Sequence, residues 1–178
     1  MAAPAYYSPS GKFSPPGLAL AAVLAPLAAA IVGTIYSYAI VYIPIAGTIS
    51  FLLAIGAGFG IGALSGTIVR VGKIRNSAVS HFVATLAGFF GFFVSWAVWM
   101  SLLMAQGGGP DVGTFYFVSV PGELWSMINT VNEVGAWEME GSTPTGGMLW
   151  FLWICETIMI LAPAIFMVTF MDGPFCEN

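Results

Sequence analysis

The chain has 178 residues, of which 58% are hydrophobic and only 7% are charged, and its net charge at pH 7 is −4. A soluble domain carries about 25% charged residues, so this composition excludes a water-soluble globular protein. A total of four Lys and Arg residues also argues against a nucleic-acid-binding surface, because phosphate binding requires clustered cations. A mean hydropathy of +0.92 indicates an integral membrane protein instead.

Four apolar runs are each long enough to cross a bilayer. About 20 helical residues span the hydrocarbon core. Such a run has to be helical, because lipid offers no partners to exposed backbone N–H and C=O groups. We therefore predict an all-α integral membrane protein, a four-transmembrane-helix bundle that forms a single domain, 1–178. The predicted spans are 17–43, 46–69, 81–104 and 148–171, with Pro44 separating the first two.

The basic residues predict the orientation of these spans. Lys12 lies in the N-terminal lead, 1–16, and the other three basic residues lie between the second and third spans. By the positive-inside rule both segments are cytoplasmic, and an even number of spans returns the tail, 172–178, to the cytoplasm. We expect a multi-pass protein of the bacterial inner (plasma) membrane. The three basic residues between the spans are Arg70, Lys73 and Arg75.

The connection 105–147 is expected to be a periplasmic outer cap, since it carries five acidic residues and no Lys or Arg. Within it, 115–120 could be a short strand or a segment lying in the membrane interface. Pro121 suits the first position of a helix, and apolar residues recur at helical spacing through 121–134, which predicts a short amphipathic helix that Gly135 ends. This helix could rest on the outer membrane face, pack on the outer ends of the spans, or do both. The side chains expected at the headgroup level are Trp125 and Trp137.

Glu156 is the main candidate for a functional residue. It lies in the fourth run, about 12 Å below the outer edge at 1.5 Å per residue. Ionisable residues at such depth usually face the bundle interior or a water-filled path. One interpretation is a proton or cation site, and the other is a hydrogen-bonded carboxyl that locks the fourth helix to its neighbours. The donors expected at its depth are Tyr36, Ser37 and Tyr38 on the first span and Trp96 and Trp99 on the third.

The second run is rich in glycine at GxxxG spacing, which lets two helix backbones approach closely in a membrane. This face could pack within the bundle or mediate self-association. It is not a phosphate-binding loop, because no strand–turn–helix context surrounds it. Gly88 and Gly91 of the third run could face it. The glycines of the second run are Gly56, Gly58, Gly60, Gly62 and Gly66.

No motif predicts catalysis or a metal site. The single histidine, His81, could hold one haem or pigment as an axial ligand, but a structural role at the cytoplasmic start of the third span is favoured. We therefore expect a non-enzymatic structural or accessory subunit that contacts the lipid bilayer and either other membrane chains or copies of itself. The alternative is a small transporter or channel with a proton or cation site at Glu156.

Six short motifs are spread over most of the chain: 7–14 (YSPSGKFS), 42–44 (YIP), 72–76 (GKIRN), 121–125 (PGELW), 135–137 (GAW) and 153–156 (WICE). Together they resemble a widespread group of uncharacterised bacterial membrane proteins. The resemblance implies a four-helix inner-membrane protein and implies no activity. Members of that group continue beyond a Pro-Phe-Cys like that ending at Cys176 into a tail with a further Cys. If this chain continued as C-x-x-C, Cys176 would be a candidate structural zinc ligand.

Overall fold

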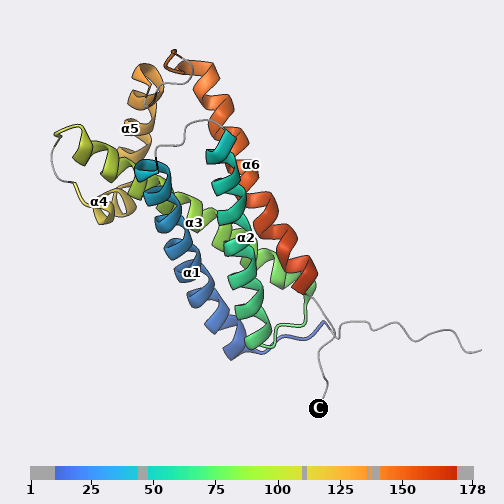
Figure 1. Ribbon diagram of the computed structural model, residues 1–178. Helices are drawn as coiled ribbons and strands as arrows, with labels where there is room; N and C mark the ends of the chain where they lie inside the picture. Colours follow the sequence, from blue (N-terminus) through green and yellow to red (C-terminus); the bar gives the residue numbers. More distant parts are fainter. Residues whose placement is uncertain (1–10, 44–47, 110–111, 136, 138–140, 172–178) are drawn as a thin grey trace, which may run out of the picture.

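The computed structural model describes residues 11–43, 48–109, 112–135, 137 and 141–171. In this part of the chain the regular elements are α-helices, and four of them are long and apolar enough to cross a membrane. The chain is therefore a multi-pass membrane protein that requires a lipid bilayer. The helices are α1 (Pro15–Tyr42), α2 (Thr48–Val71), α3 (Ser77–Gln106), α4 (Thr114–Ser119), α5 (Pro121–Val134) and α6 (Gly146–Met171) (Figure 1).

The four long helices match the four predicted spans, with ends that differ by a few residues. The predicted break at Pro44, the tail with Cys176 and part of the acidic connection lie outside the described residues. We call the end that bears α4 and α5 the cap end. The opposite end, where the α2–α3 loop lies beside the N-terminal lead, is the basic end (Figure 1).

Residues with strong capping preferences begin α1 and α3 at the basic end. The Ser14 side chain accepts a hydrogen bond from the Gly17 backbone N–H at 3.1 Å. The Asn76 side chain accepts one from the Val79 N–H at 3.1 Å. Each cap satisfies a backbone donor that the first turn of a helix leaves without a partner.

Close backbone approaches join the long helices that run in the same direction. In α1 and α3, a Cβ added to Gly33 would lie 2.3 Å from the Gly91 carbonyl oxygen. In α2 and α6, a Cβ added to Gly58 would lie 2.3 Å from the Ile160 carbonyl oxygen. Both α1 and α6 pack against α2 and α3, so α1 and α6 occupy diagonal positions in the bundle.

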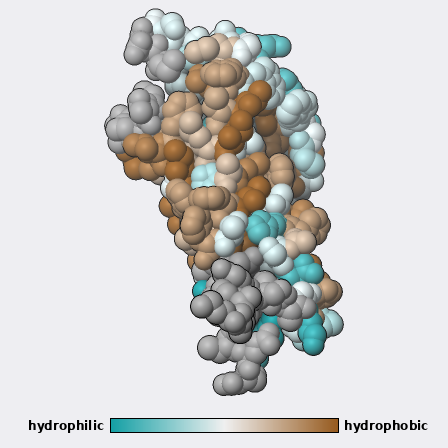
Figure 2. Space-filling model, turned by 90° about the vertical axis from the view of Figure 1, so that its right-hand side faces the viewer, coloured by the Kyte–Doolittle hydropathy of each residue, from teal (hydrophilic) through white to brown (hydrophobic). Residues whose placement is uncertain are grey.

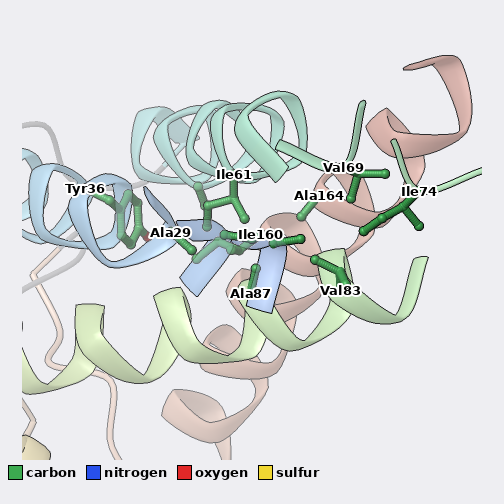
Figure 3. Packing of buried hydrophobic residues seen from close by; sticks show 12 residues of the cluster. Ala29, Tyr36, Ile61, Val69, Ile74, Val83, Ala87, Ile160 and Ala164 are labelled. Atoms are coloured by element: carbon green, nitrogen blue, oxygen red, sulfur yellow. The ribbon is translucent and has the colours of Figure 1, made fainter. Parts of the chain in front are cut away.

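Apolar side chains fill two clusters along this framework. The first lies among the four long helices, where Ile61, Ala87 and Ile160 meet from α2, α3 and α6 (Figure 3). The second joins the cap to the bundle and includes Met100, Phe117 and Leu149. Apolar residues also cover much of the middle of the face shown in Figure 2, as expected for a lipid-facing surface.

The strand considered for 115–120 is wrong, because this segment belongs to helix α4 and its C-terminal flank. A lone strand would leave its backbone groups without partners, whereas one helical turn satisfies them locally. The turn also places Phe117, which is 1% exposed, into the apolar cluster below the cap. The predicted helix 121–134 has the bounds of α5, and Gly135 follows it with a φ of 80°.

The Gly33 and Gly56 positions give a matched test of this packing. We expect Gly33→Ala to lower the free energy of unfolding by about 1–3 kcal/mol, because its methyl group would displace the α3 backbone. Gly56→Ala meets nothing within 4 Å and should stay within about 1 kcal/mol of the wild type. Unfolding in a mixed-detergent titration, followed by circular dichroism, measures both. Equal effects of the two substitutions would contradict this packing.

Candidate functional site

A hydrogen bond between two long helices lies in the half of the bundle nearer the cap end. The Tyr36 hydroxyl of α1 donates to Glu156 Oε1 of α6 at 2.5 Å. Tyr36 is 6% exposed, and Glu156 is half-buried. Because α1 and α6 are diagonal helices, this bond runs across the bundle between elements that do not pack side by side.

A second hydrogen bond, one residue along α1, ties that helix to α3. The Ser37 hydroxyl lies 2.7 Å from the Ser95 carbonyl oxygen and 3.0 Å from the Gly33 carbonyl oxygen. Ser37 is 2% exposed. Tyr36 and Ser37 thus point toward different helices, and the same turn of α1 is held by α6 and by α3.

The remaining donors predicted at this depth, Tyr38, Trp96 and Trp99, make other contacts. Tyr38 is 48% exposed and stacks on Tyr42, with ring centroids 5.8 Å apart, so it belongs to the outer surface of α1. Trp96 makes an edge-to-face contact with Trp153 at 4.9 Å, one turn before Glu156 on α6. Trp99 contacts Trp96 in the same manner at 5.4 Å.

All six tryptophans of the chain belong to one continuous series of ring contacts. The series starts at Trp125 on α5, which is 57% exposed, and reaches Trp153, which is 3% exposed. Edge-to-face aromatic pairs add about 0.5–1.5 kcal/mol each beyond the area they bury. The cap is therefore anchored to α3 and α6 beside the Glu156 site. The order of contacts is Trp125, Trp150, Trp153, Trp96, Trp99 and Trp137.

The contacts of the apolar face of α5 indicate that this helix packs on the outer ends of the long helices. They do not suit a helix that lies free on a membrane surface. Leu124, Ile128 and Val131 are at most 8% exposed and belong to the cluster shared with α3 and α6. The Asn132 amide also donates to the Gly146 carbonyl oxygen at 2.9 Å, which connects α5 to the start of α6. Of the two residues predicted at the headgroup level, Trp125 is largely exposed and Trp137 contacts Trp99.

The glycines of α2 serve different neighbours. Gly58 and Gly62 meet the α6 backbone, at Ile160 and Ala164. Gly60 lies near Val32 of α1, Gly66 is buried, and Gly56 is exposed with open space around it.

The glycines of α3 do not pair with α2 as we considered. A Cβ added to Gly91 would meet Ala29 of α1, and one added to Gly88 would meet Leu161 of α6. The GxxxG spacing indicates a close helix crossing, but it carries no information about which partner helix occupies the groove.

His81 bridges α3 and α6 at the basic end. Its Nδ1 lies 2.7 Å from the Ser77 carbonyl oxygen, and its Nε2 lies 3.1 Å from the Thr169 hydroxyl. Axial binding of a haem or pigment through Nε2 would require the loss of the Thr169 contact, so the geometry favours the structural role. Within the described residues, no three His, Cys, Asp or Glu side chains gather where they could hold a metal ion.

No protein-family model, no curated protein and no solved structure matches this chain. The interpretation of the site therefore rests on its own geometry. A phenol and a carboxyl that share one hydrogen bond can brace two helices, and they can also exchange a proton with an entering water or hold a small cation. Sequence reasoning missed Ser95, whose carbonyl oxygen is the partner of Ser37; the matching depths of the two serines on the first and third spans were the available signal.

A double-mutant cycle measures the bond between Tyr36 and Glu156. We expect Tyr36→Phe to lower the free energy of unfolding by about 1–2 kcal/mol, since it leaves the carboxyl without its donor. Glu156→Leu removes the carboxyl in a similar volume. The double variant should lose less than the sum of the two single losses, by a coupling of about 0.5–2 kcal/mol. Additive losses in the mixed-detergent titration would show that the two side chains do not interact.

Proposed function

We propose that this protein is a non-enzymatic structural or accessory subunit of a membrane complex. The observation that carries the proposal is the exposed aromatic and apolar surface of its cap. Phe115 is 82% exposed, Val134 is 68% exposed and Trp125 is 57% exposed, although the helices that bear them are well anchored to the bundle. Exposed apolar side chains on an ordered element suit contact with a partner chain.

The use of polar groups inside the bundle also supports a structural role. The Tyr36 hydroxyl is bonded to Glu156, and the Ser37 hydroxyl is bonded to the α3 backbone. These side chains hold helices together. A rigid bundle that presents a folded cap suits a subunit which acts through its contacts.

The charge pattern supports an orientation for this subunit. The four Lys and Arg residues lie at the basic end or in the segments beside it, which under the positive-inside rule faces the cytoplasm. The cap would then face the periplasm of a bacterial inner membrane, and its partner would be another membrane chain or a second copy of this one.

Purification from native membranes in mild detergent tests the proposed role. We expect the wild type to elute as part of a complex larger than the monomer, and Phe115→Ala to reduce the fraction in that complex. Phe82→Ala is the matched control, because Phe82 is 62% exposed but lies on α3 near the basic end. A wild-type chain that is monomeric under every mild condition would overturn the proposal.

A small transporter or channel is the second candidate, and the position of Glu156 favours it. A carboxyl in the middle of α6 can exchange protons or bind a cation, as ionisable residues on membrane transport paths do. The Tyr36 hydroxyl would then be the partner that the carboxyl releases during each event.

Reconstitution in liposomes distinguishes this second candidate. If Glu156 lies on a transport path, the wild type conducts protons or a cation, and Glu156→Gln abolishes the flux while the free energy of unfolding changes little, because the amide oxygen still accepts from Tyr36. Glu133→Gln, an exposed carboxyl on α5, is the control and should leave the flux intact. Wild-type liposomes with no more flux than empty ones would reject this candidate.

A further inference from the structure

The loop at the basic end is held to the N-terminal lead by several hydrogen bonds. The Arg75 backbone N–H donates to the Lys12 carbonyl oxygen at 2.8 Å, and the Asn76 amide donates to the Gly11 carbonyl oxygen at 3.2 Å. The Ser14 hydroxyl donates to the Gly72 carbonyl oxygen at 3.1 Å. These three bonds join the N-terminal lead and the α2–α3 loop into one surface.

Lys73 holds an unusual backbone conformation on this surface. Its φ is 53°, and it is the one non-glycine residue with positive φ among those the structure describes. An L-residue with a side chain is disfavoured in this left-handed region, where glycine or asparagine is normally found. The next residue, Ile74, is fully buried in the main apolar cluster, so the loop backbone is anchored beside the strained position.

The Lys73 side chain is exposed, and glycine would adopt this left-handed conformation at the end of α2 at lower cost. Strained residues that persist on an anchored backbone are concentrated at functional sites. The positive charge of the side chain is the property that glycine lacks.

The depth of this surface places it among lipid headgroups. Helix α1 begins at Pro15, α2 ends at Val71 and α3 begins at Ser77, so the loop and the lead lie at the edge of the hydrocarbon core. Lys12 is exposed, as is Lys73. Phe13 and Val71, each adjacent in sequence to this surface, are 46% and 67% exposed and offer apolar contact beside the charges.

The distribution of charge among the described residues favours an anionic ligand. All four Lys and Arg residues of the chain lie in or beside this surface. The acidic residues that the structure describes lie elsewhere: Glu123 and Glu133 on α5 of the cap, and Glu156 in the cap-end half of α6. Basic groups next to membrane helices attract anionic lipid headgroups over zwitterionic ones.

We propose that the basic end binds the phosphodiester headgroup of an anionic phospholipid, with Lys12 and Lys73 contacting the phosphate and Phe13 and Val71 contacting the acyl chains. If these lysines served only to orient the protein in the membrane, only their charge and their side of the membrane would matter. Orientation does not require a lysine on a strained, anchored backbone, nor the hydrogen bonds that bring Lys12 beside the loop. A lipid site would use both.

The strained position provides a test in which stability and binding move in opposite directions. We expect Lys73→Gly to raise the Tm in zwitterionic detergent by about 2–4 °C, because glycine relieves the backbone strain. The same substitution should weaken binding of phosphatidylglycerol about fivefold, the loss expected for one lysine near an anionic headgroup. Native mass spectrometry of the full chain, titrated with phosphatidylglycerol or with phosphatidylcholine of the same acyl chains, counts the bound lipids.

Three controls define the outcome. Lys73→Arg keeps the charge and should keep the lipid preference. Ser126→Asp, on an exposed position of α5, changes the net charge by the same amount as Lys73→Gly and should leave lipid binding unchanged. Inorganic phosphate at millimolar concentration should fail to displace the lipid; displacement would assign the site to free phosphate. Equal wild-type binding of the two lipids, or unchanged phosphatidylglycerol binding by Lys73→Gly, would overturn the proposal.

Discussion

Close contact between helix backbones at small residues is the interaction on which this bundle depends. Lipid tails are as apolar as leucine, so burial of apolar area cannot by itself drive helices together inside a membrane. Backbone approach can, because it brings many atoms into van der Waals range. Gly33 against Gly91 and Gly58 against Ile160 provide such approaches for the two parallel helix pairs, α1–α3 and α2–α6. The larger side chains of the core then occupy space that these crossings define.

A hydrogen bond between long helices connects a pair of helices that the glycine contacts do not connect. The glycine crossings hold α1 to α3 and α2 to α6, whereas the bond from Tyr36 to Glu156 joins α1 to α6 along the diagonal. Each buried polar side chain also needs a partner, because a lone one in hydrocarbon is costly. The same bond therefore satisfies the carboxyl and connects the two parallel pairs.

Hydropathy was sufficient to predict the four long helices, and Pro121 with the spacing after it was sufficient for α5. Counting depth along the spans also identified Tyr36 among the donors for Glu156. The lateral pairing of helices could not be predicted in this way. A span exposed to lipid is apolar on all faces, so its sequence lacks the amphipathic period that tells an inner face from an outer one. Without that period, the sequence did not show that Gly88 and Gly91 face α6 and α1 instead of α2. For the same reason, no local pattern indicated the series of tryptophan contacts.

The two ends of the molecule differ from its middle. Between its ends the face shown in Figure 2 is largely apolar, and Glu156, the one carboxyl among the described residues of the long helices, is bonded to Tyr36. At the ends, by contrast, ordered elements hold side chains in costly positions: Phe115 exposed on the cap, and Lys73 on a left-handed backbone at the basic end. Stability alone accounts for neither, since both positions would be more favourable with other residues. A partner on the cap side and a lipid headgroup on the basic side would each offset the cost at its own end.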